Sequence, residues 1–189
     1  DGARIEEASF MPLGGIEQWV TIRGDDRSNP VLLHLHGGPG FTFSAFTADF
    51  APYEAHFTVV QWDQRGSGCT FGRYGEATPE LTVDRIVSDA IELAAQLRAR
   101  FDNRRVVVLG HSFGSIVGTE MVRRAPVHFA LYAGTAQVGS FAGAVEAQLA
   151  YLRGLAPADA DLAAQLDALV APDSQSIQKY AAVNRLLQG

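Results

Sequence analysis

Short runs of apolar residues alternate with longer amphipathic stretches between residues 29 and 134. Four runs, at residues 31–35, 57–62, 105–110 and 128–134, are continuous and rich in β-branched or aromatic residues. Runs of this kind are typical of strands that are covered on both faces. A further strand is expected at residues 16–22, where apolar positions alternate, and a turn at residues 24–26 follows it.

Helical patterns separate the strand-like runs. Thr82 is a suitable N-cap for a helix in which apolar residues recur at helical spacing as far as Phe101. A second helix is expected from about Phe113 to Arg124, just before Pro126. This alternation predicts the α/β class, with a mostly parallel sheet, right-handed crossovers and helices on both faces.

The last fifty residues have a different texture. They are rich in Ala, Leu and Gln, and three helical segments are expected at residues 142–155, 159–170 and 176–188, broken at Pro157 and Pro172. The sequence therefore predicts two regions, an α/β core over residues 1–139 and the beginning of a helical cap over residues 140–189.

Composition narrows the classes of partner. The 189 residues are 47% hydrophobic, which suits a globular fold with a sizeable core, and the net charge of −6 argues against nucleic acid or an anionic membrane as partner. No apolar stretch has the roughly 18–20 residues that span a bilayer. The single cysteine excludes an internal disulfide, so a reducing compartment such as the cytoplasm is the default. The chain begins at Asp1, so we expect any targeting segment to have been removed or never present, which leaves secretion open.

The sequence Gly110-His111-Ser112-Phe113-Gly114 joins an apolar strand directly to an amphipathic helix. A serine on such a sharp turn is lifted above the sheet, and glycines two residues to either side leave room for the strained backbone. The helix that follows favours negative charge at its start. A serine that merely caps a helix is the alternative, but the strand before it and the helix after it favour Ser112 as a nucleophile.

A glycine-rich turn, residues 34–40 with the sequence HLHGGPG, follows the strand at residues 31–35. Acyl transfer needs donors aimed at the oxyanion of the tetrahedral intermediate, and such a turn lets backbone N–H groups point there. We expect the N–H groups of Gly38 and Phe113 to form this oxyanion hole, with His36 and Gly37 supporting the loop. An ordinary glycine turn is the alternative reading, and neither nucleotide-binding glycine motif is present.

A third motif, residues 59–70 with the sequence VVQWDQRGSGCT, begins within the strand at residues 57–62 and continues into the loop after it. We expect the two charges of Asp63 and Arg65 to pin this loop beside the site, and structural support is favoured over a direct catalytic role. Cys69 is interpreted as a small buried filler.

Together these three motifs resemble the α/β-hydrolase superfamily, and within it the proline iminopeptidase-like branch. The resemblance covers about residues 16–140 and rests on residues 36–40, 62–68 and 110–115, although Phe113 and Cys69 stand where many relatives carry Trp and Arg. It implies the α/β-hydrolase fold, a Ser-Asp-His mechanism and a helical cap inserted after the sixth strand. It also implies that a cap carboxylate such as Glu146 could contact a substrate amine.

A general base is missing from the motifs. In this fold the acid and the histidine follow the serine along the chain, yet the five histidines are His34, His36, His56, His111 and His128, and each is interpreted as structural. We therefore expect the later strands, the acid and the base to come from sequence outside this chain, as a second chain, a further segment or the part lost by truncation. By itself this chain should show little turnover.

Two classes of function follow. The first is a serine hydrolase that acts on peptide or amide bonds, most simply an aminopeptidase that releases an N-terminal proline or small residue, or else an esterase or a different amide hydrolase. The second is a non-catalytic binding module that keeps the fold. No cofactor or metal is expected, because no H-E-x-x-H motif, cysteine cluster or nucleotide loop is present.

Overall fold

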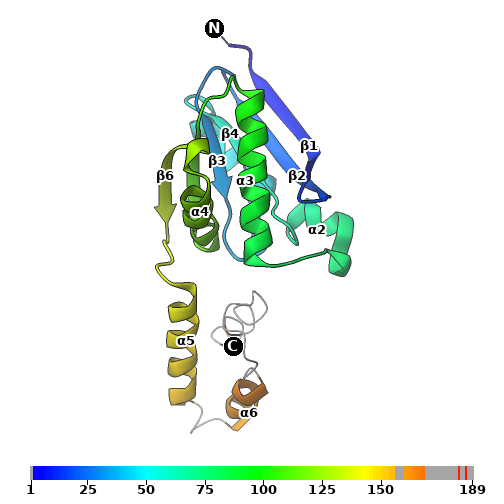
Figure 1. Cartoon of the computed structure of the whole chain (residues 1–189). Coiled ribbons are helices and arrows are strands. Elements are labelled where there is room, and N and C mark those ends of the chain that lie inside the picture. Colours follow the sequence, from blue (N-terminus) through cyan, green and yellow to red (C-terminus); the bar gives the residue numbers. More distant parts are fainter. Residues whose placement is uncertain (1, 156–159, 169–182, 184–185, 187–189) are drawn as a thin grey trace. The chain divides into compact units, whose positions relative to one another are not determined.

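The computed structural model describes residues 2–155, 160–168, 183 and 186. The chain divides into two compact units, residues 1–137 and 138–189, each described by itself (Figure 1). The sequence predicts this boundary two residues later, at residues 139/140. The first unit holds all the strands of the described chain and the three motifs, and the second is helical.

The first unit is built on a six-stranded sheet with the strand order β1-β2-β4-β3-β5-β6. Strand β1 pairs antiparallel with β2, and β2 antiparallel with β4, whereas β4, β3, β5 and β6 run parallel. The strands are β1 (Ile5–Leu13), β2 (Ile16–Gly24), β3 (Val31–Leu35), β4 (Thr58–Trp62), β5 (Val106–His111) and β6 (Phe129–Thr135). The predicted mostly parallel sheet is confirmed.

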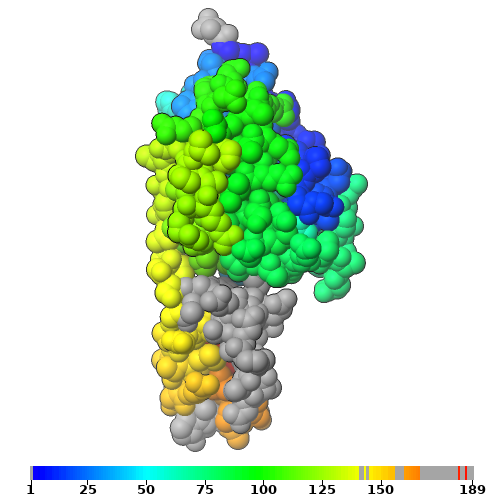
Figure 2. Space-filling model, viewed as in Figure 1, coloured from blue at the N-terminus to red at the C-terminus, as the bar shows by residue number. Residues whose placement is uncertain are grey.

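Helices cover both faces of this sheet. The long helices α3 (Val83–Arg100) and α4 (Phe113–Arg124) lie on the face seen in Figure 2, and Thr82 caps α3 by accepting the Arg85 N–H. The opposite face carries α1 (Thr47–Glu54). Helix α2 (Gly68–Tyr74) and the short 3₁₀ turns η1 (Ser44–Phe46), η2 (Gly75–Ala77) and η3 (Pro126–His128) lie in the connections.

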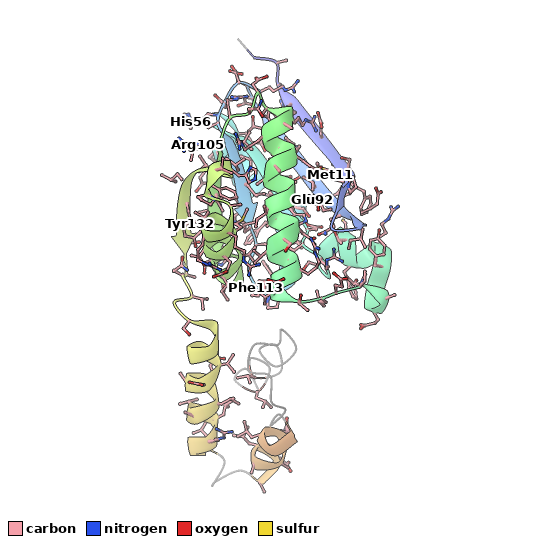
Figure 3. All side chains as sticks on the ribbon, in the orientation of Figure 1. Met11, His56, Glu92, Arg105, Phe113 and Tyr132 are labelled. Carbon is pink, nitrogen blue, oxygen red and sulfur yellow. The ribbon has the colours of Figure 1, made fainter. Side chains whose placement is uncertain are left out.

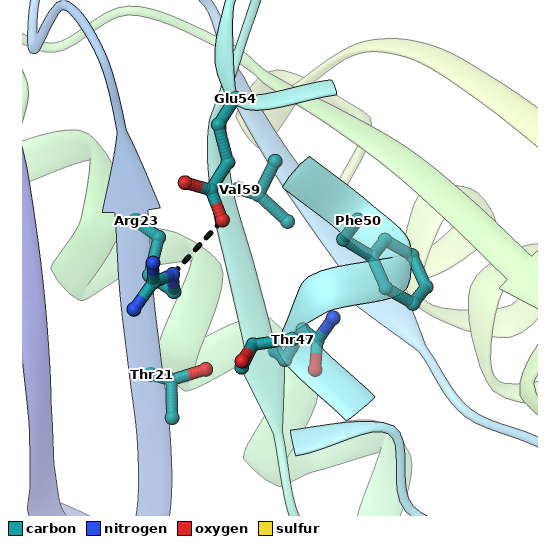
Figure 4. A pocket seen from close by; sticks show the side chains of 7 residues that line it. Thr21, Arg23, Thr47, Phe50, Glu54 and Val59 are labelled. Carbon is teal, nitrogen blue, oxygen red and sulfur yellow. Dashed lines mark hydrogen bonds and ion pairs between the residues drawn. The ribbon is translucent and has the colours of Figure 1, made fainter. Parts of the chain in front are cut away.

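Strand periodicity explains which residues meet which helix. On β2, Gln18 reaches Asp89 of α3, whereas Arg23 faces α1 from the other side of the sheet. There the guanidinium of Arg23 donates to the buried carboxylate of Glu54 at 2.9 Å, in a small hollow lined also by Phe50 and Val59 (Figure 4). Its hydrogen bond to Glu54 raises the pKa of Arg23. Alternate residues of one strand therefore attach to opposite layers.

Three sequence expectations need correction. Strand β1 was not predicted, because its sequence IEEASFMPL carries two adjacent glutamates and a proline, which an exposed edge strand tolerates. Gly24 ends β2 and does not begin a turn, since β2 continues through its pairing with Ile5. The apolar run at β6 is not covered on both faces: β6 is the other edge of the sheet, and Leu131 is 56% exposed.

The second unit contains α5 (Phe141–Leu155), which follows β6 along the chain, and α6 (Ala160–Ala168). Its own small core consists of Val145, Leu149, Leu152, Leu166 and Val183. The third predicted helix, residues 176–188, lies outside the described residues except for Val183 and Leu186. No helix in the described part of the chain is long and apolar enough to cross a bilayer.

Candidate active site

Ser112 lies at the junction between β5 and α4. Its backbone has a conformation that residues other than glycine rarely adopt. Its φ of 51° and ψ of −118° belong to neither a strand nor a helix. Its N–H donates to the Thr135 carbonyl at 2.9 Å, and its carbonyl accepts the Ser115 N–H at 2.8 Å and the Ser115 hydroxyl at 2.6 Å. Its own hydroxyl bonds to no other group in the described part of the chain. The turn is therefore held by its backbone, and the side chain is left free.

The glycines on either side of Ser112 are required by close contacts. A Cβ on Gly110 would lie 2.8 Å from the Gly114 carbonyl oxygen, and a Cβ on Gly114 would lie only 2.1 Å from the Leu35 carbonyl oxygen. Strand β5, helix α4 and the end of β3 thus approach one another more closely than side chains permit. Arg105 precedes β5 and Phe113 begins α4, so the two residues labelled in Figure 3 lie just beyond the two ends of β5, and Ser112 is next to Phe113.

The glycine loop passes directly beside Ser112. A Cβ on Gly37 would lie 3.0 Å from the Cβ of Ser112 and 3.1 Å from the ring of His111. The Phe41 N–H returns to the Gly37 carbonyl at 3.3 Å, which closes the loop. Gly38 has a φ of 111°, so a glycine is needed where the chain turns over the serine.

His36 fixes the direction of this loop. Its Nε2 accepts the Gln64 N–H at 3.3 Å, so its proton is on Nδ1, which donates to the Gly37 carbonyl at 2.9 Å. The Gln64 side-chain amide also donates to the His36 carbonyl, at 3.3 Å. The Gly37 carbonyl and the Gly38 N–H share one planar trans peptide and point in opposite directions. Holding the first therefore orients the second.

Burial keeps this histidine neutral. His36 is 2% exposed, and burial lowers its pKa, although the Gly37 carbonyl and the Asp63 carboxylate oppose the shift. Burial also lowers the pKa of His34, to about 4, helped by His36 and His111. At neutral pH both rings are therefore uncharged, which the tautomer of His36 requires.

The two expected oxyanion donors belong to two segments beside Ser112: Gly38 is in the glycine loop, and Phe113 follows Ser112 at the turn between β5 and α4. Neither the Gly38 N–H nor the Phe113 N–H has a hydrogen-bond acceptor among the described residues. Phe113 begins α4, whose N-terminal end favours negative charge. Two unpaired backbone donors beside an unpaired hydroxyl form an arrangement that can hold a negatively charged oxygen.

Asp63 and Arg65 support the loop after β4 through separate partners, and not through each other. Asp63 is 1% exposed, and one carboxylate oxygen accepts the Cys69 N–H at the start of α2 at 2.8 Å. Its other oxygen, Oδ1, has no partner among the described residues. Arg65 pairs instead with Asp89 of α3, at 2.9 Å, with both side chains buried.

The partners of Arg65 form a buried network that sequence reasoning missed. Asp89 accepts from Arg65, from the Gln18 amide at 2.7 Å and from Arg85 at 2.8 Å, and the Trp62 indole donates to Gln18 at 3.0 Å. Arg65 also donates to two backbone carbonyls, at 2.8 and 2.9 Å. The available signal was an aspartate on the apolar face of the helix at residues 83–100.

The remaining histidines have their own places. His111 contacts the Thr135 hydroxyl at 3.0 Å, and His128 contacts Arg98 at 3.2 Å from the turn before β6, not from the strand. His34 packs between aromatic rings, and His56 follows the end of α1. None of the five histidines hydrogen-bonds the Ser112 hydroxyl.

Two further residues that the sequence singled out, Cys69 and Glu146, are both exposed. Cys69 is exposed, not a buried filler, because it lies in the first turn of α2 beside Thr70, which takes the buried position. Glu146 is exposed on α5, in the second unit. In the described part of the chain, no three His, Cys, Asp or Glu side chains are grouped to hold a metal ion.

A family model described as "Alpha/beta hydrolase family" matches residues 31–187. The chain is 35% identical over 129 residues to a probable aminopeptidase, YbaC, of Bacillus subtilis, which covers 68% of this chain and 40% of that protein. It is 29% identical over 117 residues to the lysophosphatidylserine lipase ABHD12 of Gallus gallus, covering 56% of this chain and 29% of that protein.

Among solved structures, a proline iminopeptidase-related protein of Thermus thermophilus superposes with a TM-score of 0.62 and 28% identity. The match covers 98% of this chain and 66% of that one. The chain thus spans less than half the length of the two curated relatives named above.

Proposed function

Because this chain belongs to the alpha/beta hydrolase family, we propose that it carries the nucleophile of a serine hydrolase, Ser112. The fold class and the resemblance to the proline iminopeptidase-like branch, both expected from the sequence, are confirmed by the family match and the relatives. The observation that carries the proposal is the conformation of Ser112. Ser112 is a non-glycine residue with a φ of 51°. Its hydroxyl is free, and hydrogen bonds hold its backbone on both sides.

The proposed reaction is acyl transfer. The Ser112 Oγ forms a bond to the acyl carbon while its proton passes to a general base, and the carbonyl oxygen becomes an oxyanion. The N–H groups of Gly38 and Phe113 stabilise that oxyanion, and each such donor is worth about 2.7–4 kcal/mol in the transition state. The base then protonates the departing amine as the carbon–nitrogen bond breaks, and water releases the acyl group.

For the substrate we propose a peptide or amide with an N-terminal proline or small residue. The support comes from the relatives, one named as a probable aminopeptidase and one as proline iminopeptidase-related. Glu146, exposed on α5, is our candidate to bind the substrate ammonium. An ester substrate is the second candidate, favoured by the similarity to a lipase.

The base and the acid, in our proposal, come from a further part of the hydrolase that pairs with β6. This edge strand carries no charged residue between Phe129 and Thr135, and most of its side chains are exposed. Edge strands that remain unpaired usually carry charges or proline. The greater length of the relatives supports the same idea. With one cysteine and no disulfide to form, we propose the cytoplasm as its compartment.

The test is covalent labelling with a fluorophosphonate, read by intact mass, on the longer hydrolase that supplies the base and on its Ser112→Ala variant. One adduct on the first and none on the second supports Ser112 as the nucleophile. Labelling that survives in Ser112→Ala would contradict it. A panel of aminoacyl arylamides and short-chain aryl esters, assayed on the longer hydrolase, then separates the peptidase from the esterase. A longer protein that hydrolyses neither series would favour a binding module.

A further inference from the structure

Aromatic side chains gather directly after the glycine loop. Phe41 and Phe43 have ring centroids 5.5 Å apart, and Phe41 stacks on Phe46 at 6.2 Å with an angle of 11° between the ring planes. Phe43 also contacts Phe50 at 5.8 Å, and Phe50 contacts Tyr53 at 5.9 Å. Five rings from one short segment thus form a continuous cluster.

The cluster is half-buried in its middle and open at both ends. Phe43 and Phe50 pack against the buried ring of His34, at 5.1 and 4.8 Å. Phe41 and Phe46, which we call the aromatic shelf, are 59% and 48% exposed. Contiguous exposed aromatic surface is uncommon on soluble proteins and often marks a place where a ligand or partner binds.

The aromatic shelf begins at the candidate nucleophile. The Phe41 N–H is bonded to the Gly37 carbonyl, and Gly37 lies against Ser112. The Phe43 ring is 6.2 Å from the ring of His111, the residue before the serine. The segment that bears the aromatic shelf therefore adjoins Ser112 and the loop that carries Gly38.

We propose that Phe41 and Phe46 form a subsite that binds an uncharged, apolar ring of the substrate beside the scissile carbonyl. The occupant is a substrate group because the shelf adjoins Ser112 and the loop that bears Gly38. It is apolar because residues 37–48 contain no charged side chain. Flat or cyclic groups pack best on aromatic faces. The inference rests on the proposed function, since it takes Ser112 as the reacting group.

The experiment compares two sulfonyl fluorides that differ in one ring, phenylmethanesulfonyl fluoride and methanesulfonyl fluoride. With each, the Ser112 Oγ–sulfur bond forms, the sulfur–fluorine bond breaks and fluoride leaves, and at pH 9 the hydroxyl proton passes to the solvent. The labelling rates of this chain are measured by intact mass for the unaltered chain and for the variants Phe41→Ala and Phe46→Ala. Tyr53→Ala is the matched control, an aromatic residue 45% exposed at the far end of the cluster.

We expect Phe41→Ala and Phe46→Ala to lower the rate ratio of the phenyl to the methyl reagent by about 3- to 10-fold. The rate with the methyl reagent should stay within about twofold, because the oxyanion loop is intact, and Tyr53→Ala should leave the ratio unchanged. An unchanged ratio in both shelf variants, or an equal loss with both reagents, would overturn the subsite.

Failure of the proposed function has a different signature. If neither reagent modifies Ser112, binding of benzamide to the Ser112→Ala chain is measured by ligand-observed NMR. Binding that is lost on adding Phe41→Ala but kept with Tyr53→Ala would support the shelf as a ring-binding site without the nucleophile. Equal binding in all these variants, or none, would reject the shelf as well.

Discussion

Two polar regions of the first unit follow opposite rules. In the Arg65–Asp89 network, which also includes Gln18, Trp62 and Arg85, the carboxylate accepts from three side chains and the guanidinium donates to two backbone carbonyls as well. In the elbow region, made of Ser112, Phe113 and the glycine loop, a hydroxyl and two N–H groups have no partner among the described residues.

The difference in hydrogen bonding separates polar groups that hold the fold together from polar groups that are available for a reaction. Buried polar groups are normally satisfied, as they are in the Arg65–Asp89 network. The groups of the elbow region are not all buried, since Gly38 is exposed and Ser112 is half-buried, so they are available to bond a substrate. The nearby Asp63 and Gln64 fit the second pattern in part, because each has one buried side-chain oxygen without a partner in the described chain. His36 ties the glycine loop to the loop after β4, since it bonds to both the Gly37 carbonyl and the Gln64 N–H.

The largest loss of stability should come from breaking the Arg65–Asp89 network. Asp89→Ala leaves the buried guanidinium of Arg65 without its counter-charge, and we expect a loss of about 3–5 kcal/mol in the free energy of unfolding. The control is Asp84→Ala on the same helix, where the carboxylate is 76% exposed and its pairing with Arg124 is worth at most about 1 kcal/mol. Urea denaturation followed by circular dichroism measures both. Equal losses would refute the contrast.

Acid should act on the histidines beside the elbow region. A free histidine has a pKa near 6.5, and in the folded chain the pKa of His34 is about 4 because the ring is buried. Below pH 6.5 the unfolded chain therefore binds a proton that the folded chain does not. Stability is complete above pH 6.5 and is lost as the pH falls toward 4, by about 3 kcal/mol for this group.

The measurement is the free energy of unfolding from pH 7 to pH 4, for the unaltered chain and for His34→Leu. The variant should lose much of the pH dependence. His36, whose pKa burial also lowers, should account for part of what remains. A variant as pH-sensitive as the parent would show that His34 does not contribute.

A smaller effect should follow from filling the contact between β3 and α4. In Gly114→Ala the new methyl meets the carbonyl oxygens of Leu35 and His36, both of them backbone atoms, and must push the start of the glycine loop aside. We expect a loss of about 1–3 kcal/mol in the free energy of unfolding. Gly72→Ala, in α2 with open space around it, should instead gain up to about 1 kcal/mol. Thermal unfolding of the two variants should shift in opposite directions.

Sequence reasoning found the parts of the first unit that short-range patterns encode. The helix at Phe113–Arg124 was predicted with its observed bounds, because a strained serine and a proline mark its two ends. The strands at β3, β4 and β5 were found within a residue or two from their apolar runs. The glycines around Ser112 predicted that backbone segments lie close together there. The contacts of Gly110 with Gly114, and of Gly114 with Leu35, are close backbone contacts of this kind.

What the sequence could not supply was pairing between distant residues. Arg65 was expected to act together with Asp63, two residues away, but its partner Asp89 is 24 residues away on another element. The strand β6 was predicted from its apolar run, but its open face was not, because an apolar run looks the same whether or not a helix covers it. The exposure of the aromatic rings in residues 41–53 could not be predicted for the same reason, since only packing decides which of them are covered.

The smallest predicted effect concerns the cost of keeping Ser112 in place. A φ of 51° with a ψ of −118° is unfavourable for any residue with a Cβ, typically by about 1–3 kcal/mol, and glycine escapes most of it. Glycine also loses about 0.5–1 kcal/mol through its greater freedom in the unfolded chain. Ser112→Gly should therefore stabilise the chain by about 1 kcal/mol while abolishing fluorophosphonate labelling. Ser88→Gly, at a partly exposed helical position in α3, should destabilise it by about the same amount. If Ser112→Gly is no more stable than the parent, the elbow is not strained. The unpaired groups around it would then be an ordinary feature of a helix start, and the contrast between the two regions would disappear.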